Sequence, residues 1–492
     1  MSAPRGNQEA TAYDVIVLGA GPVGQNVADR ARAAGLSVAV VERELVGGEC
    51  SYWACVPSKA LLRPVIAVAD ARRVDGARQA VTGRLDTDGV FARRNRYVTD
   101  WDDSGQALFL KSIGADLFRG HGRLDGPRQV TVTRDDGTRH TLTARHAVAI
   151  ATGSRPNLPG IPGIEEARPW TNRHGTDSST VPARLVVVGG GGVGVEMATL
   201  WQGLGSQVTL LARRRLIPRL EPFAGELVAQ GLSESGADVR IGAQVTALRR
   251  PDPEGPVTLT LDDSSELEAD EVLFATGRTP ATSDIGLDTI GLTPGSWLDV
   301  DTTCLVNGVE GDWLYALGDV NHRALLTHQG KYQARTAGDA IATRAAGQPV
   351  DDAPWGDHAT TADQHAVPQV FFTDPEAAAV GLTAEQAEQA GHRIKTVDLD
   401  FNAAQGANLY ADGYRGHARL VVDLDREILL GVTFVGPGVS ELLHSATIAV
   451  AGEVPLKRLR HAIACFPTVS EIWLFLLTAY QRDQKTPETA PA

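Results

Sequence analysis

The sequence is poor in cysteine and has no long hydrophobic run, and both absences restrict what the protein can be. Its 492 residues include only four cysteines, of which Cys304 and Cys465 are isolated in the sequence. No apolar stretch approaches the about 18 residues that a membrane-spanning helix needs. Residues 1–12 are polar, so we expect no signal peptide and a cytoplasmic location, where structural disulfides are rare. The net charge of −14 argues against binding to nucleic acid or an anionic membrane.

The other two cysteines, Cys50 and Cys55, lie five positions apart at a predicted helix start. Within a regular helix they would be about 7.5 Å apart along the axis, beyond the roughly 4.4–6.8 Å that a disulfide allows. Pro57 is tolerated only in a first helical turn, so the helix begins at 55–57 and Cys50 lies in an irregular turn before it. A helix start favours a thiolate and lowers a cysteine's pKa. We interpret the two as a working redox pair; the alternatives are a structural disulfide or two unrelated buried thiols.

Residues 13–42 have the pattern of a dinucleotide-binding βαβ unit. An apolar strand at 13–18 leads into a G-x-G-x-x-G motif, an alanine-rich helix and a second strand at 37–41. The three glycines are Gly19, Gly21 and Gly24. They allow a pyrophosphate to approach the helix N-terminus closely. Glu42, eighteen residues after the last glycine, can accept hydrogen bonds from an adenosine ribose. The alternative is a glycine-rich turn in an unrelated α/β fold.

The same fingerprint recurs between an apolar strand at 184–188 and a second strand at 207–211. Its glycines are Gly189, Gly191 and Gly194. The acidic residue is missing here: Ala212 stands in its place and is followed by Arg213, Arg214 and Arg215. Arginines bind a 2′-phosphate that a carboxylate would repel, which favours NADPH over NADH. The alternative is a solvated basic turn.

Further elements are also duplicated. An Ala-Thr-Gly-x-x-Pro element follows each fingerprint, at 151–156 and 275–280, and each is preceded by a predicted β-meander, at 129–143 and 257–267. A strand at 313–320 ends in Gly318 and Asp319, whose carboxylate can hydrogen-bond a cofactor hydroxyl. From residue 366 the pattern becomes that of an α+β domain. We therefore expect the α/β class, with two similar nucleotide-binding modules that suit hydride transfer between two dinucleotides.

Taken together, these motifs resemble the pyridine nucleotide–disulfide oxidoreductases, the flavoproteins that include glutathione reductase, dihydrolipoamide dehydrogenase and mercuric reductase. The resemblance covers nearly the whole chain, including the C-x₄-C-x-P-S-K motif and a Phe-Thr-x-Pro-Glu motif at 372–376. It implies two Rossmann-like domains of the three-layer ββα type and a C-terminal α+β domain that makes a homodimer. The implied boundaries are an FAD domain at 1–175 and 297–362, an NAD(P)H domain at 176–296, a dimerisation domain at 363–482 and a disordered tail at 483–492.

The resemblance also implies the site. Electrons from NADPH would pass through FAD to a Cys50–Cys55 disulfide, with Cys55 facing the flavin and Cys50 exchanging with the acceptor. Lys59 would lie against the flavin and pair with Glu196. The implied catalytic residues are Cys50, Cys55, Lys59, Glu196 and Glu471. The implied FAD ligands are Gly19, Gly21, Gly24, Glu42, Gly48, Lys59, Gly153 and Asp319, and the implied NADPH ligands are Gly189, Gly191, Gly194, Arg213, Arg214 and Gly277. No metal site is expected.

One family position departs from the pattern. The family carries His-Pro-Thr near its C-terminus, and this chain has Phe466 in place of the histidine. Phenylalanine cannot move a proton, whereas acid–base help is typically worth about 10²–10⁴-fold in rate. Glu471 is left without its implied partner, and His461 and Cys465 are the nearby candidates for a substitute.

We therefore expect an NADPH-dependent flavoprotein whose acceptor is a quinone-like oxidant or a low-molecular-weight disulfide. Tyr52 and Trp53, between the cysteines, either shape the acceptor site or simply pack the helix start. One alternative is dihydrolipoamide dehydrogenase-like or metal-ion reductase-like activity. Another is a catalytically impaired flavoprotein that serves as a binding or sensing subunit.

Overall fold

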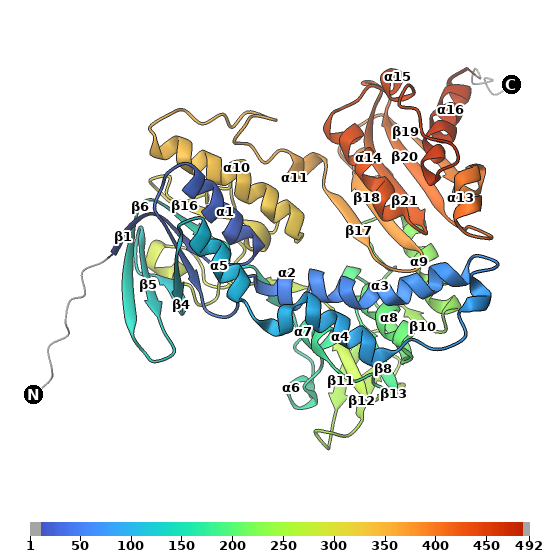
Figure 1. Cartoon of the computed structure of the whole chain (residues 1–492), viewed down its shortest axis with the longest axis horizontal. Coiled ribbons are helices and arrows are strands. Elements are labelled where there is room, and N and C mark those ends of the chain that lie inside the picture. Colours follow the sequence, from blue (N-terminus) through green and yellow to red (C-terminus); the bar gives the residue numbers. More distant parts are fainter. Residues whose placement is uncertain (1–10, 486–492) are drawn as a thin grey trace, which may run out of the picture. The chain divides into compact units, whose positions relative to one another are not determined.

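The computed structural model describes residues 11–485, which form two compact units (Figure 1). Unit 1 contains the residues up to Pro57 together with Asn95–Pro156 and Arg278–Gln364. Unit 2 contains Ser58–Arg94, Asn157–Gly277 and the residues from His365 onward. Both units are discontinuous in sequence, and the helices α3 (Cys55–Arg72), α4 (Thr87–Tyr97) and α11 (Ala362–His365) span their boundaries.

Unit 1 is built on a seven-stranded sheet with the order β3-β2-β1-β6-β5-β4, in which β16 also pairs with β6. Its strands are β1 (Thr11–Leu18), β2 (Val38–Glu42), β3 (Asp116–Arg119), β4 (His121–Leu124), β5 (Gln129–Thr133), β6 (Arg139–Ile150) and β16 (Leu314–Ala316). The strands β1, β2, β3 and β16 are in parallel pairings, whereas β4, β5 and the first part of β6 form an antiparallel meander.

Strand β1 is apolar at successive positions because both of its faces are buried. Ile16 and Leu18 pack with the meander, whereas Val15 and Val17 pack beneath two helices. These helices, α1 (Pro22–Ala33) and α10 (Thr327–Ala345), lie side by side (Figure 1). The unit also contains α2 (Gly48–Tyr52), α5 (Ser104–Ser112), the 3₁₀ turn η4 (Gly318–Asn321) and the short strand pair β7 (Ser154–Pro156) and β15 (Arg278–Pro280).

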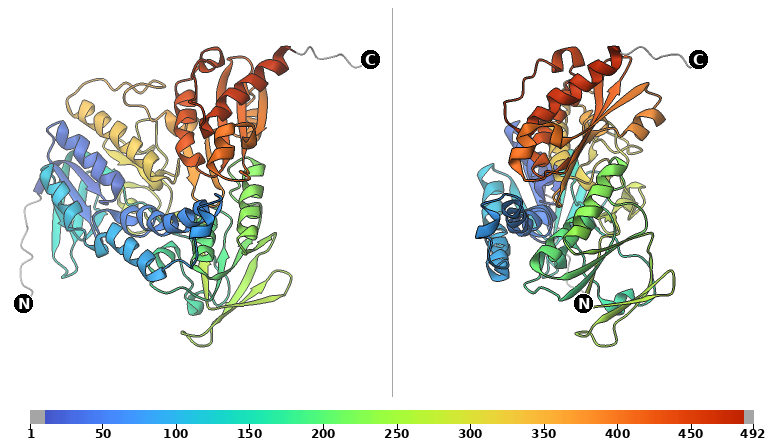
Figure 2. Two further views of the ribbon diagram at one scale, coloured as in Figure 1. Left: turned by 45° about the vertical axis from the view of Figure 1, so that its right-hand side comes forward. Right: turned by 90° about the vertical axis from the view of Figure 1, so that its right-hand side faces the viewer.

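Unit 2 contains a second Rossmann-like sheet, which is parallel with the order β10-β9-β8-β14. Its elements are α6 (Ile164–Ala167), α7 (Asn172–Asp177), β8 (Arg184–Val188), α8 (Gly192–Leu204), β9 (Gln207–Ala212), α9 (Pro222–Glu234), β10 (Asp238–Ile241) and β14 (Glu271–Phe274). A three-stranded antiparallel sheet, seen as long yellow-green strands in Figure 2, follows β10. Its strands are β11 (Val245–Arg249), β12 (Val257–Leu261) and β13 (Glu266–Ala269).

The C-terminal part of unit 2 is a five-stranded antiparallel sheet with the order β17-β18-β21-β20-β19. The helix α14 packs on β18 and β21 (Figures 1 and 2). The elements are β17 (Pro368–Phe371), β18 (Glu376–Gly381), α12 (Ala384–Gln389), β19 (Ile394–Asp400), α13 (Gln405–Tyr410), β20 (His417–Asp423), β21 (Ile428–Gly436), α14 (Val439–Ala451), α15 (Leu456–Leu459), the 3₁₀ turn η6 (Val469–Glu471) and α16 (Ile472–Lys485).

The predicted α/β class, with two Rossmann-like folds and a C-terminal α+β region, is confirmed. The helix α16 continues to Lys485, and the rest of the predicted tail, 486–492, lies outside the described residues. None of the helices between residues 11 and 485 combines the length and hydropathy that a bilayer-crossing segment needs.

Candidate functional site

The predicted cysteine pair lies at a break between two helices. Helix α3 begins at Cys55, which confirms the predicted helix start. Cys50 lies in the one-turn helix α2, not in an irregular turn as expected, and the backbone leaves helical geometry only at Trp53, with φ −138°. Tyr52 is buried and its hydroxyl donates to the carbonyl of Val46, so this aromatic ring packs the helix start.

Both cysteines are free thiols in the structure. Hydrogen bonding with Cys55, burial and the negative charge of a Cys55 thiolate raise the pKa of Cys50. The expectation that the helix start would lower a thiol pKa is therefore wrong for Cys50, because the neighbouring sulfur and desolvation outweigh the dipole. The proton of the pair is held more firmly on Cys50 than on an ordinary cysteine.

Helix α10 supplies two groups near the sulfurs that the sequence analysis missed. The Thr327 hydroxyl lies 3.2 Å from Cys55 Sγ, and Thr327 also begins α10. Its hydroxyl and the Lys331 ammonium both lower the pKa of Cys50, although they do not reverse its rise. The N-terminal end of this 19-residue helix adds a positive partial charge. No sequence motif indicates this arrangement, since Thr327 is 272 positions from Cys55.

The first fingerprint forms a cradle that fits a pyrophosphate. Gly19 has a φ of +97°, and a Cβ at Gly24 would collide with the carbonyl of Gly19. A Cβ at Gly21, in contrast, meets nothing within 4 Å, so the middle glycine faces open space at the start of α1. Gly48 packs against it, because a Cβ there would lie 3.0 Å from the Gly21 Cα. A side chain at the middle position would fill the space that a phosphate needs.

Glu42 ends β2 beside this cradle and is buried. Its carboxylate accepts hydrogen bonds from the Ala20 N–H at 2.7 Å and from the Glu44 N–H at 2.8 Å. Burial raises the pKa of Glu42, and these N–H groups partly offset the rise. A carboxylate can accept about four hydrogen bonds, so two bonds leave capacity for ribose hydroxyls.

The two duplicated Ala-Thr-Gly elements meet at Asp319. The strands β7 and β15, which follow these elements, pair antiparallel with each other. The Ser154 hydroxyl of β7 donates to the Asp319 carboxylate, and Arg278 Nε of β15 lies 3.8 Å from the same carboxylate. The Thr152 hydroxyl, next to Gly153, is buried with no hydrogen-bond partner among the described residues. A buried hydroxyl without a partner fits a bound polar cofactor.

The second fingerprint in unit 2 reproduces the first. Gly189 has a φ of +129°, a Cβ at Gly194 would collide with the Gly189 carbonyl, and a Cβ at Gly191 meets nothing within 4 Å. At the end of β9, Ala212 is buried, and Arg213 and Arg214 are exposed in the following turn. Arg215 donates to the carbonyls of Pro218 and Leu220 and so shapes the turn.

Gly277 is the last residue of the Asn157–Gly277 segment of unit 2; its φ is +125°, and a Cβ there would meet nothing within 4 Å. Its carbonyl accepts from the N–H of Asn157 in unit 2. Its predicted contact with NADPH stays a prediction.

Lys59 and Glu196 form an ion pair in unit 2, as predicted. Lys59 Nζ lies 2.6 Å from Glu196 Oε2, and the carboxylate is only 9% exposed. The other oxygen accepts from the Phe372 N–H at 3.1 Å, and the ammonium also lies 4.8 Å from the Phe372 ring centre. Phe372, the first residue of the Phe-Thr-x-Pro-Glu motif, is thus a site residue that the sequence analysis did not assign.

We expect Lys59→Met to lower the free energy of unfolding by about 1–3 kcal/mol, because it leaves the buried Glu196 carboxylate without its cation. Arg63→Met on the same helix is the control, since the Arg63 side chain is 59% exposed in its pair with Asp70. Exposed ion pairs contribute about 0–1 kcal/mol to the free energy of unfolding. Urea unfolding of both variants makes the comparison, and equal losses would show that the Glu196 pair behaves as a surface pair.

The C-terminal motif differs from the family pattern in structure as well as in sequence. Phe466 is 74% exposed, and His461 and Cys465 are exposed as well. The buried Glu471 carboxylate accepts from the Gly406 N–H at 2.9 Å. Glu471 therefore lacks its implied histidine partner but binds the backbone at the start of α13 instead.

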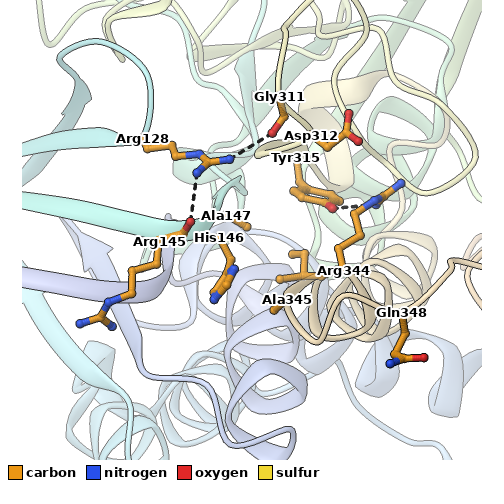
Figure 3. Close-up of a pocket in the computed structure, with 11 residues that line it drawn as sticks. Arg128, Arg145, His146, Ala147, Gly311, Asp312, Tyr315, Arg344, Ala345 and Gln348 are labelled. Carbon is orange, nitrogen blue, oxygen red and sulfur yellow. Dashed lines mark hydrogen bonds between the residues drawn. The ribbon is translucent and has the colours of Figure 1, made fainter.

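A cavity of about 360 Å³ lies elsewhere in unit 1 (Figure 3). Its polar lining is mainly basic, with Arg128, His146 and Arg344 among its residues. The two guanidinium groups already bind protein oxygens: Arg128 donates to the Arg145 and Gly311 carbonyls, and Arg344 donates to the Tyr315 hydroxyl at 2.7 Å. None of the predicted site residues lines this cavity.

Two sequence comparisons identify the family. Residues 13–340 match the profile described as "Pyridine nucleotide-disulphide oxidoreductase", and residues 367–474 match its dimerisation domain. The chain belongs to the pyridine nucleotide–disulphide oxidoreductase family. Members of this family are flavoprotein oxidoreductases, so the chain is an enzyme that uses FAD and NAD(P)H.

Relatives of this oxidoreductase carry several activities in their names. Dihydrolipoyl dehydrogenase 3 of Pseudomonas aeruginosa is 34% identical over 92% of this chain and 94% of its own. Mercuric reductase of Staphylococcus aureus is 29% identical over 93% of this chain and 81% of its own. The HOCl-induced flavoprotein disulfide reductase RclA of Escherichia coli, in its Cu(II) complex, superposes with a TM-score of 0.80 at 24% identity, covering 95% of this chain and 99% of that one. The last likeness shows the fold alone.

Proposed function

We propose that this flavoenzyme uses NADPH to reduce a small-molecule acceptor through a Cys50–Cys55 disulfide. The observation that carries the proposal is the pair of free thiols at the break between α2 and α3, where Cys55 Sγ lies 3.2 Å from the Thr327 hydroxyl of α10 and Cys55 is the largest influence on the pKa of Cys50. Two thiols in contact need little movement to form a disulfide, and a disulfide at a helix break is readily reduced and remade. Bound FAD supplies the two-electron transfer between a nicotinamide and the sulfurs.

The residues then have distinct roles toward a disulfide acceptor. The Cys50 sulfur attacks the acceptor and releases its first thiol, and the Cys55 sulfur attacks the mixed disulfide and releases the second. This leaves a Cys50–Cys55 disulfide, which two electrons from NADPH reduce again. The fingerprint glycines, Glu42 and Asp319 would hold FAD.

The acceptor is proposed to be a quinone-like oxidant or a low-molecular-weight disulfide. Phe466 offers no proton acceptor where the family has histidine, and Glu471 is engaged by Gly406. Lipoamide and glutathione disulfides depend on acid–base help at that position, so we expect them to be poor acceptors. A quinone-like oxidant does not require thiol exchange.

We propose further that residues 1–175 with 297–362 bind FAD and that residues 176–296 bind NADPH. Residues 363–482 would form the interface of a homodimer, in keeping with the match of 367–474 to the dimerisation domain. Light scattering of the purified protein tests the dimer: a mass near twice 52.1 kDa is expected.

Differential alkylation tests the disulfide. The air-oxidised enzyme is alkylated before and after anaerobic NADPH, and the labelled peptides are identified by mass spectrometry. We expect Cys50 and Cys55 to be labelled only after NADPH, whereas the exposed Cys465 is labelled in both samples. Labelling of both cysteines before NADPH would remove the disulfide from the mechanism.

A parallel screen of quinones, disulfides and metal ions identifies the acceptor, and no turnover with any of them would favour a sensing role.

The coenzyme preference depends on the exposed arginines after β9. We expect Arg213→Ala to lower kcat/KM for NADPH by about tenfold and to leave NADH unaffected, because one charge-assisted contact to the 2′-phosphate contributes about 1.5–3 kcal/mol. Arg249→Ala, an exposed arginine on β11, is the control. Steady-state rates with both coenzymes measure the effect, and equal kcat/KM values for NADPH and NADH in every variant would contradict the assignment.

A further inference from the structure

A buried carboxylate in unit 1 lies outside the predicted set of site residues. Asp363 of α11 is 7% exposed and lies against α10. Its two oxygens accept from two glutamine side chains one turn apart on α10: Gln329 Nε2 donates to Oδ1 at 2.9 Å, and Gln333 Nε2 donates to Oδ2 at 2.8 Å. Arg323 approaches only to 4.0 Å. The Arg323 guanidinium donates instead to the Thr360 hydroxyl and to the backbone carbonyls of Val300 and Asp301.

Only one of the two glutamines continues the network. The Gln333 Oε1 accepts from the Gly318 N–H at 2.7 Å and from Asn321 Nδ2 at 2.9 Å. These two donors are the first and last residues of η4 (Gly318–Asn321). Gly318 has a φ of +72°, and Asp319, the proposed FAD ligand, follows it directly. The network therefore ends at the backbone that presents Asp319.

We propose that Asp363 is a positioning residue for FAD, which acts through Gln333 to hold the Gly318–Asn321 turn in the geometry that presents Asp319 to the cofactor. An ionised carboxylate accepts on both oxygens, so both glutamine amides must point their NH₂ groups toward it. This fixes the Gln333 Oε1 toward Gly318. A flipped amide would place NH₂ against the Gly318 N–H, a contact between two donors that leaves both unsatisfied. The proposal rests on the assignment of Asp319 to FAD.

The energetics agree with a role in function rather than in stability. Burial raises the pKa of Asp363 to about 6, and the two glutamines and Arg323 only partly offset it. Keeping the Asp363 carboxylate ionised at neutral pH therefore lowers the stability of the fold, because desolvation disfavours the charged form. An apolar residue would avoid that cost. The ionised Asp363 carboxylate fixes the orientation of the Gln333 amide against the Gly318 N–H.

A matched pair of variants tests the proposal in the full-length protein. Gln329→Leu and Gln333→Leu each remove one buried amide from the same carboxylate on the same helix, but only Gln333 contacts the turn. After FAD is removed, we measure its dissociation constant by the change in flavin fluorescence. Gln333→Leu should raise it about tenfold, whereas Gln329→Leu should stay within about twofold of the wild type. Asp363→Leu should follow Gln333→Leu.

Hydrogen exchange gives a readout that does not depend on activity. Amide exchange in the peptide that contains residues 318–321 of the FAD-free protein should accelerate in Gln333→Leu and Asp363→Leu, but not in Gln329→Leu. Equal shifts in FAD affinity for the two glutamine variants, or wild-type affinity in Asp363→Leu, would overturn the proposal. If Asp319→Ala binds FAD like the wild type, the assignment of Asp319 fails, which is a separate result.

Discussion

Cys50→Ser is expected to lower the reduction of a disulfide acceptor by roughly 10³-fold or more, in the range found when a catalytic nucleophile is removed. The serine hydroxyl cannot form a mixed disulfide with the acceptor. Cys50 and Cys55 are both free, partly buried thiols in the structure. Cys55→Ser should be equally severe, because the mixed disulfide then has no second thiol to resolve it.

Two comparisons make the result specific. Cys465→Ser removes an exposed thiol outside the pair and should retain wild-type rates with every acceptor. A quinone acceptor should still be reduced by Cys50→Ser, because its reduction needs no sulfur exchange. Steady-state rates with one disulfide and one quinone, at saturating NADPH, separate the two routes. Disulfide reduction by Cys50→Ser at the wild-type rate would exclude Cys50 as the exchanging thiol.

The sequence predicted those parts of the fold whose signals are local. The strands predicted at 37–41 and 184–188 are found at Val38–Glu42 and Arg184–Val188, because each is a short apolar segment with turn residues at its ends. The strands β17 and β18 were not predicted, since four-residue Pro368–Phe371 and the alanine-rich Glu376–Gly381 carry little periodicity. These strands are fixed by their partners in the sheet.

The candidate site shows the same division. The glycine cradles and Glu42 could be predicted, because spacing along the chain specifies them. The Lys59–Glu196 pair was implied by the family resemblance. The hydrogen bond between Glu471 and Gly406 could not be predicted. Gly406 lies 65 positions away and donates through its backbone N–H, which every residue except proline has. The direction of the Cys50 pKa also depends on burial and on Cys55, and only the folded structure shows these two effects together.

The same thiol sets the pH dependence of the wild-type enzyme. Since the pKa of Cys50 is raised, its thiolate is scarce at neutral pH, and the thiolate fraction grows about tenfold per pH unit below the pKa. No imidazole stands at position 466 to take the proton. We therefore expect the rate of disulfide reduction to rise about tenfold per unit between pH 6 and 8, and pH profiles at saturating NADPH measure the slope. A flat profile would show that another group already removes the proton.

Phe466→His is expected to raise the reduction of lipoamide or glutathione disulfide by about 10²-fold near neutral pH, at the lower end of what general acid–base catalysis contributes. The family resemblance implies that residue 466 serves the exchanging thiol, and an imidazole there, with an ordinary pKa of about 6.5, would take the Cys50 proton, so the steep pH profile should flatten above pH 7. Phe466 is 74% exposed, and its replacement should cost little stability. Phe466→Ala is the control, because it removes the ring without adding a base. An equal gain in both variants would mean that the ring blocks the acceptor, and no gain in Phe466→His would mean that proton transfer does not limit these substrates.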